Sequence, residues 1–340
     1  MTEDSLTPIT PAEAKEMYLE QRKREVSDST IKAHHYRLKH FVRWCEDVEG
    51  IENLNTLDGR DLQRFKMWRR DDGDLNNVTM VTQLSTLRVF VSWCEDIDAV
   101  APGTHDKVLM PSLSKNEDRR TELLDNAAAT QLIEYLRQFE FSTRTHALVE
   151  LLWHTGMRIG ATHGLDVDDY DCDERRVEVR HRPDTETRLK NKNEGERYVS
   201  LTADVCDALD AYLKYNREKA VDDHGRRPLF SSKYGRAAKS SLRDSIYRAT
   251  RPCQYTGKCP HDREIDSCEA MEKNKASRCP SSVSPHAIRR GSITQHLSKD
   301  VPEKVVSDRM NVSLDVLEKH YDRRGEREKA EQRRDYLDNV

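Results

Sequence analysis

The stretch RTHALVELLWHTGMRIGATHGLDVDDYDCDERRVEVRHR, residues 144–182, contains the change of pattern that decides the fold class of this chain. Its first part has apolar residues at helical spacing, whereas RRVEVRHR at 175–182 alternates apolar and polar residues as a strand does. A second short strand is predicted for ERYVSL at 196–201. The flanking segments, AAATQLIEYLRQF at 127–139 and the residues after Asp204, have helical patterns. We therefore expect a mainly α fold with a small β-sheet.

The first hundred residues also have the patterns of helices. Ser27-Asp28-Ser29 can cap a helix over TIKAHHYRLKHFVRWCEDVEG, residues 30–50. A second segment, VTMVTQLSTLRVFVSWCEDIDAV at 78–100, repeats this pattern, and both contain Trp-Cys-Glu-Asp. Between them LDGRDLQRFKMWRRD at 57–71 predicts a shorter helix with a basic face. The repeat fits two DNA-contacting helices or two helices packed on one core, and the basic face fits a groove reader or a solvated surface.

The helical pattern breaks in APGTHDKVLMPSLSKNEDRR, residues 101–120, where prolines, a glycine and polar residues indicate a linker. The chain of 340 residues with 36% hydrophobic content is long enough for two cores. We expect a helical domain at residues 1–112, a linker at 113–122 and an α+β domain at 123–340. The second domain would carry a cysteine-rich insertion at about 251–283.

The charge of the chain is nearly balanced, with 57 Lys plus Arg against 61 Asp plus Glu. This balance does not by itself indicate a nucleic-acid-binding protein, although basic residues cluster locally. The acidic content fits a salt-rich cytoplasm as well as an ordinary solvated surface. No apolar run approaches the roughly 20 residues that cross a bilayer, and MTEDSLTPITPAEAKEMYLEQ lacks the features of a signal peptide. We expect a soluble, cytoplasmic protein with no membrane partner.

Three motifs give the chain a specific resemblance. LLWHTGMRIGATHGLDVDDYD at 151–171, SPHAIRRGSITQHL at 284–297 and LEKHYDRR at 317–324 follow one another in order. Together they resemble the catalytic segments of the tyrosine recombinases, the phage-type and Xer-like integrase family. The resemblance implies catalytic roles for Arg158, His286, Arg289 and Tyr321. It also implies a helical, SAM-like core-binding domain joined to an α+β catalytic domain, the two closing around duplex DNA.

The chemistry that the resemblance implies suits these residue types. An attacked phosphodiester gathers negative charge on its non-bridging oxygens, which the planar guanidinium groups of Arg158 and Arg289 can bind. Tyr321 would be the nucleophile, and His286 would handle its proton because a phenol has a pKa near 10. The product would be a 3′-phosphotyrosine intermediate, so religation needs neither ATP nor a cofactor.

The family also uses a lysine, in the turn between two strands, to protonate the leaving 5′ oxygen. RLKNKNEGERYVSL at 188–201 resembles that turn. Counting back from Val199 selects Lys192, with Lys190 as the second choice. A lysine in a charged hairpin is most often only solvated, so the assignment depends on the neighbouring motifs.

One position departs from the family pattern. Family members often carry His or Trp within a Leu-Gly-His-Ser element before the nucleophile, and the matching segment is Met310-Asn311-Val312-Ser313. Val312 cannot donate a hydrogen bond to a phosphate. Either Asn311 or another donor replaces it, or the site lacks one supporting contact and is slower.

The eight cysteines fall into two groups. We predict that Cys45, Cys94, Cys172 and Cys206, which lie among apolar neighbours, are small core residues. Within the insertion, thiolates suit a structural zinc ion, and the predicted ligands are Cys253, Cys259, Cys268 and Cys279. His261 could replace Cys259. The absence of Cys-x-x-Cys pairs keeps free thiols as the alternative.

The chain is therefore predicted to be a site-specific DNA recombinase or integrase whose partner is double-stranded DNA. A homo-oligomer of up to four copies on DNA is expected, and the charged tail after Tyr321 fits either docking on a neighbouring copy or a frayed end. Two alternatives remain. A type IB-like topoisomerase would not need an assembly on specific sites, and a non-catalytic zinc-containing DNA-binding protein would not need Tyr321.

Overall fold

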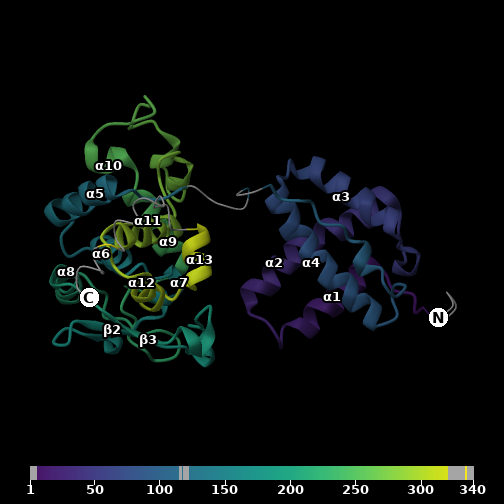
Figure 1. Cartoon of the computed structure of the whole chain (residues 1–340), viewed down its shortest axis with the longest axis horizontal. Coiled ribbons are helices and arrows are strands. Elements are labelled where there is room, and N and C mark those ends of the chain that lie inside the picture. The colour runs from purple at the N-terminus through teal and green to yellow at the C-terminus, as the bar shows by residue number, and fades with distance from the viewer. Residues whose placement is uncertain (1–5, 115–116, 118–121, 321–333, 335–340) are drawn as a thin grey trace. The chain divides into compact units, whose positions relative to one another are not determined.

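The computed structural model describes residues 6–114, 117, 122–320 and 334, and the chain divides into two compact units, Met1–Arg120 and Thr121–Val340. Both units are largely helical (Figure 1). In the described part of the chain, β-structure occurs only in the second unit, as one three-stranded and one two-stranded sheet. The predicted class, mainly α with a small sheet, is confirmed, and the two-stranded sheet is an addition to it.

The first unit is a bundle of helices. The α-helices of its described part are α1 (Pro11–Arg22), α2 (Asp28–Arg43), α3 (Gly59–Gly73) and α4 (Asn77–Asp96). α2 continues into the π-helical turn Trp44–Glu49, and 3₁₀ turns cover Leu54–Thr56 and His105–Lys107.

The ends of α2 follow from its sequence. The Ser27 side chain accepts a hydrogen bond from the Thr30 backbone N–H, and Gly50 ends the π-helical turn at φ 73°. The predicted helix over 30–50 is thus confirmed, with a change of pitch at Trp44. Both Trp-Cys pairs, at 44–45 and 93–94, are buried in one core. The Trp-Cys pairs of the repeat therefore pack in one core.

The second unit carries the remaining elements. Its described α-helices are α5 (Asn126–Phe139), α6 (Arg144–Thr155), α7 (Ile159–Gly164), α8 (Ala203–Tyr215), α9 (Lys239–Ala249), α10 (Pro252–Thr256), α11 (Pro285–Ser298), α12 (Glu303–Met310) and α13 (Leu314–His320). The strands are β1 (Tyr170–Asp171), β2 (Arg176–Val179), β3 (Arg197–Ser200), β4 (Ser231–Ser232) and β5 (Gly235–Arg236). Short 3₁₀ turns cover Val167–Asp169, Pro183–Thr185, Lys192–Gly195, Glu269–Met271 and Ala276–Arg278.

Helix α6 is the centre of this unit and packs against α5, α8, α9 and α11. Its residues from His146 to Trp153 are all buried, because it is surrounded by other helices. The strands pair in the antiparallel order β1-β2-β3, with Val177 opposite Val199. Both valines are buried, as the alternating pattern predicts. The long connection from β2 to β3 carries Lys190 and Lys192.

One prediction about the core is wrong. Cys45, Cys94 and Cys206 are buried, but Cys172 is exposed, because it lies in the turn between β1 and β2. Its immediate neighbours in sequence are Asp171 and Asp173, so the apolar setting that was expected for this cysteine is absent. In the described residues, no helix combines the length and apolar character that a membrane span requires.

Candidate active site

Arg158 lies in the sharp turn that joins α6 to α7. Helix α6 ends at Thr155, and Gly156 follows at φ 59°, a left-handed conformation that glycine adopts without steric cost. A Cβ atom on Gly156 would lie 2.6 Å from Sδ of Met310, so the glycine also allows α12 to approach. Arg158 is the N-cap residue of α7, and its half-buried side chain lines a cavity.

His286 and Arg289 lie one turn apart on α11. The helix begins with Ser284, whose side chain accepts a hydrogen bond from the Ala287 backbone N–H. The three-residue spacing places His286 and Arg289 on one face of the helix. Arg289 is only 1% exposed and His286 is exposed, and both line the same cavity as Arg158. The structure therefore brings together three of the five predicted catalytic residues.

The two guanidinium groups are held by backbone carbonyls around the end of α12. Arg289 Nη1 donates to the carbonyls of Gly156, at 2.6 Å, and Met310, at 2.7 Å. Arg158 Nη1 donates to the carbonyl of Asn311 at 2.8 Å, and Arg289 Nη2 donates to the same oxygen at 3.4 Å. These carbonyls orient both arginines but carry no net charge. Both guanidinium-bearing residues line the cavity.

The cavity has a volume of about 300 Å³ and a strongly basic lining. None of the described residues that line it is acidic. The ionisable residues of this lining are Arg158, Arg188, Lys190, Arg197, His286 and Arg289. Such a concave basic site suits an anionic group such as a phosphodiester.

The two candidate lysines differ in their positions. Lys190 is exposed and lines the cavity. Lys192 is also exposed but is not among the lining residues, and its backbone has a φ of 49°. The sequence spacing selected Lys192, whereas the geometry brings Lys190 to the arginines. Spacing alone could not separate them, because the two lysines lie two residues apart in the same connection.

Arg197 is a member of the cavity that the sequence analysis missed. Its Nε donates to the carbonyl of Arg309 at 2.9 Å, and its Nη1 donates to that of Gly195 at 2.8 Å. Burial, together with repulsion from Arg158 and Arg309, lowers the pKa of Arg197 to about 10. It therefore remains charged at neutral pH. An arginine at the start of an alternating strand looks solvent-facing in sequence, so no pattern signalled it.

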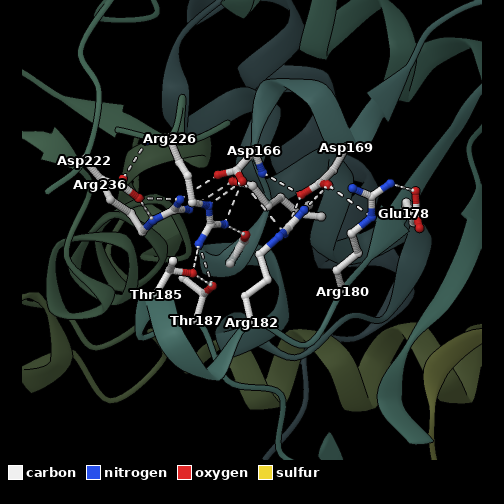
Figure 2. A network of polar contacts seen from close by, with 12 residues as sticks. Asp166, Asp169, Glu178, Arg180, Arg182, Thr185, Thr187, Asp222, Arg226 and Arg236 are labelled. Carbon is white, nitrogen blue, oxygen red and sulfur yellow. Dashed lines mark hydrogen bonds and ion pairs between the residues drawn. The ribbon is translucent and has the colours of Figure 1, made fainter. Parts of the chain in front are cut away.

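Arg226 ties the β2–β3 connection to the segment that follows α7 (Figure 2). Its Nε donates to Asp166 Oδ2 at 2.7 Å, and its Nη2 donates to the carbonyl of Gly164 at 3.1 Å. On the other side, its Nη1 donates to the hydroxyls of Thr185 and Thr187. One guanidinium group thus joins the end of α7 to the chain that leads to the lysines.

The same network extends to either side of Arg226 (Figure 2). Arg236 bridges Asp166 and Asp222, and Arg182 makes a two-bond contact with Asp169. Asp166 and Asp169 are buried, and each is paired with an arginine, as buried carboxylates require. The network thus fixes the first part of the β2–β3 connection, at Arg182, Thr185 and Thr187, through paired opposite charges and hydrogen bonds.

The segment before the predicted nucleophile differs from the family pattern in structure as in sequence. Val312 is 6% exposed and packs in an apolar cluster with Met310 and Leu317. Asn311, not Val312, lines the cavity. Tyr321 lies outside the described residues, and so does the charged tail after it.

The predicted zinc ligands do not assemble into a ligand set in the described structure. There, no group of three or more His, Cys, Asp or Glu side chains is arranged to hold a metal ion. Burial raises the pKa of the Cys253 thiol, and the neighbouring Cys279 and Cys259 raise it further. The described residues of the insertion thus show an electrostatic influence among three thiols but no metal-binding group. His261 Nε2 lies 2.8 Å from the Ser281 hydroxyl.

Family models match both units of the chain. A model of the phage integrase family matches residues 122–322, and a model of the phage integrase N-terminal SAM-like domain matches residues 16–96. The first match contains every predicted catalytic residue.

Curated relatives carry recombinase names. A probable integrase/recombinase protein of Methanocaldococcus jannaschii is 22% identical over 292 residues, covering 85% of this chain and 79% of that protein. Tyrosine recombinase XerD of Mycobacterium tuberculosis is 27% identical over 246 residues, covering 66% of this chain and 74% of that protein.

Solved structures share the fold. The Tn1549 transposon integrase in complex with a circular intermediate DNA has a TM-score of 0.69 at 16% identity, covering 96% of this chain and 99% of that one. A lambda integrase dimer bound to a core site has a TM-score of 0.64 at 13% identity, covering 94% of this chain and 79% of that one.

Proposed function

The chain belongs to the phage integrase family, that of the tyrosine recombinases, and we propose that it cuts and rejoins DNA at specific sites through a 3′-phosphotyrosine intermediate. The observation that carries this proposal is the basic cavity into which Arg158, His286 and Arg289 converge from two separate segments. Three residues of types that phosphoryl transfer needs, two arginines and a histidine, thus line one cavity.

Arg158 and Arg289 bind the non-bridging oxygens of the attacked phosphate in this mechanism. The carbonyls of Gly156, Met310 and Asn311 orient the two groups before the DNA arrives. Preorganised donors of this kind stabilise the charge that develops in the transition state. Arg197, which is charged and lies on the same cavity, adds positive potential.

Tyr321 attacks the phosphorus through its phenolic oxygen. The Tyr321–phosphorus bond forms, and the bond from phosphorus to the 5′ oxygen breaks. His286, exposed on the cavity wall, accepts the phenolic proton or orders the phosphate. Because the bond energy is conserved in the phosphotyrosine, attack by a 5′ hydroxyl reverses the step without ATP.

The released 5′ oxygen takes a proton from a lysine. We propose Lys190 as this acid because it lines the cavity, with Lys192, selected by spacing, as the alternative. Separate Lys190→Ala and Lys192→Ala variants would distinguish them. The variant that lacks the acid should cleave about 10²- to 10⁴-fold more slowly.

The partner in this proposal is double-stranded DNA. Recombination joins two DNA sites, so we expect several copies of this chain to assemble on them. Residues 1–112 would form the core-binding domain, 113–122 the linker and 123–340 the catalytic domain. Lambda integrase is recorded as a dimer on a core site and as a tetramer on a Holliday junction. By analogy this chain would assemble as up to four copies on DNA, and would work in the cytoplasm, where its substrate lies.

A structural zinc ion in the insertion at 251–283 remains a proposal that rests on the four thiols. Cys253, Cys259, Cys268 and Cys279 are suitable ligands by type, but their described arrangement does not fit one metal site. Elemental analysis of the purified protein, with each cysteine changed to serine in turn, would test it. One zinc per chain, lost in the variants, supports the site, and no zinc at any stage supports free thiols.

The covalent intermediate can be tested with nicked DNA that traps it. Substrates from the genomic neighbourhood of the gene would be incubated with wild type and Tyr321→Phe, and a protease-sensitive protein–DNA adduct would be scored. We expect an adduct in the wild type alone. An adduct that survives in Tyr321→Phe would contradict the assignment of the nucleophile.

The two alternative functions give different results in the same assay. A type IB-like topoisomerase would form the adduct and relax supercoils without an assembly on specific sites. A non-catalytic DNA-binding protein would bind the DNA tightly and form no adduct.

A further inference from the structure

Asn311 contacts both arginines that would hold the phosphate and the loop that carries the candidate lysines. Its backbone has a φ of 51°, a left-handed conformation that asparagine and glycine tolerate best. This conformation directs its carbonyl to the arginines, Arg158 at 2.8 Å and Arg289 at 3.4 Å. The carbonyl of Asn311 thus contacts the arginines, while its side chain is available for other contacts.

The side chain of Asn311 reaches the β2–β3 connection. Its Oδ1 accepts a hydrogen bond from Asn191 Nδ2 at 2.5 Å, and its Nδ2 donates to the carbonyl of Glu194 at 3.2 Å. Asn191 lies between the two candidate lysines in sequence, and Glu194 closes the turn after them. Both functional ends of the amide thus contact the lysine-bearing loop, and Oδ1 also accepts a longer hydrogen bond from Arg158 Nη1 at 3.5 Å.

The two ends of the loop are held by other residues, because Leu189 N–H donates to His181 Nδ1 at 3.0 Å and Arg197 Nη1 donates to the Gly195 carbonyl at 2.8 Å. Residues 190–194 are all exposed, whereas the Arg226 network holds the chain several residues earlier, at Thr185 and Thr187. An exposed loop that carries a flexible lysine gains positional order from two hydrogen bonds to a fixed point. Asn311 is such a fixed point because α12 packs against α11 and α13.

We propose that the side chain of Asn311 is a positioning device for the leaving-group acid, and that its carbonyl separately orients the arginines. This inference rests on the proposed recombinase function. The amide ties Asn191 and Glu194, and through them the neighbouring lysine, to the position of the bound phosphate. Val312, which is buried in an apolar cluster, takes no part in this arrangement.

One substitution removes the amide but keeps the carbonyl, which makes the shorter of the two contacts with Arg158. Asn311→Gly keeps the left-handed backbone and the carbonyl that the arginines contact, but it removes the amide. Asn191→Ala removes one of the same hydrogen bonds from the loop without altering α12. Asn193→Ala is the matched control, because Asn193 is exposed on the same loop and contributes no bond to Asn311.

The readout compares two nicked DNA substrates, one with the natural 5′ oxygen and one with sulfur in its place. A thiolate leaves without protonation because its conjugate acid is far stronger than an alcohol, so the sulfur substrate bypasses the lysine. We expect Asn311→Gly and Asn191→Ala to slow cleavage of the oxygen substrate about 10- to 100-fold. Both should cleave the sulfur substrate at close to the wild-type rate, and Asn193→Ala should match wild type on both.

Other outcomes identify which claim fails. If Asn311→Gly slows both substrates equally, or neither, the positioning inference is overturned. If Lys190→Ala and Lys192→Ala both remain slow with the sulfur substrate, neither lysine is the acid, and the inference falls with that assignment. If Tyr321→Phe still forms the adduct, the proposed nucleophile is wrong, whatever the asparagine variants do.

Discussion

Arg226 donates a hydrogen bond of 2.9 Å from its Nη1 to the hydroxyl of Thr187, and so joins the β2–β3 connection to the segment after α7. The remaining donors of Arg226 contact Asp166 and the carbonyl of Gly164. Arg226 and Thr187 lie in the part of the second unit that supports the lysine-bearing loop. Neither residue lines the cavity that holds the predicted catalytic arginines.

Arg226→Leu should destabilise the protein strongly, because it leaves Asp166 in a buried site with one fewer cation. Loss of one member of a buried ion pair costs about 3–5 kcal/mol, although Arg236 still contacts Asp166. Thr187→Val should cost about 1 kcal/mol. Urea denaturation would measure both. The control is Arg227→Ala, since Arg227 pairs with Asp168 on the surface and should change stability by less than about 1 kcal/mol. Equal losses for Arg226 and Arg227 would contradict the role of burial.

Gly291→Ala should disrupt the packing of α11. A Cβ atom there would lie 1.9 Å from the carbonyl oxygen of Leu124, which is backbone and cannot swing away. We expect a loss of roughly 2–4 kcal/mol in the free energy of unfolding. Gly160→Ala is the matched control, because nothing lies within 4 Å of the added Cβ in α7. Thermal denaturation that ranks the two variants equally would contradict the prediction.

The acid stability of the protein should depend on Glu150, a fully buried residue of α6 that contacts Arg137, His146 and His154. Burial acts to raise the pKa of Glu150, but contacts with His146, His154 and Arg137 outweigh it and hold the pKa below its usual range. A lowered folded pKa contributes stability above the unfolded value of about 4.3, and this contribution is lost as the pH falls below that value.

Glu150→Gln should therefore lower the free energy of unfolding by about 3 kcal/mol at neutral pH. The difference from wild type should shrink as the pH falls below about 4. Denaturant titrations across this range would measure it, with the exposed Glu134→Gln as control. A difference that stays constant with pH would show that the charge of Glu150 is not responsible.

Arg289→Lys should separate binding from chemistry. Lysine keeps the positive charge but cannot donate from one planar group to the carbonyls of Gly156 and Met310 and to a phosphate. We expect DNA affinity to change little and strand cleavage to fall about 10²- to 10³-fold. Arg290→Lys, which alters the neighbouring arginine outside the cavity, should cleave at close to the wild-type rate. If Arg289→Lys and Arg290→Lys slowed cleavage equally, the proposed role of the Arg289 guanidinium in binding the phosphate would be contradicted.

Local patterns predicted much of this molecule. The helix over residues 30–50, the strand alternation around Val177 and Val199 and the motif around Arg158 depend on neighbours a few residues apart. The prediction for Cys172 was wrong because this residue lies in the polar turn between β1 and β2, flanked by Asp171 and Asp173. Side-chain direction in a short turn is decided by strand pairing, which joins distant residues.

By itself, the sequence determined the mainly helical class and the family, because motif order and periodicity are properties of the chain alone. Only the tertiary structure decided that Lys190 rather than Lys192 lines the cavity, that Arg197 joins it, and that Asn311 contacts both the arginines and the lysine loop. The physical reason is distance along the chain. Asn311 and Asn191 are separated by 120 residues, and a hydrogen bond of this kind depends on the packing of whole helices.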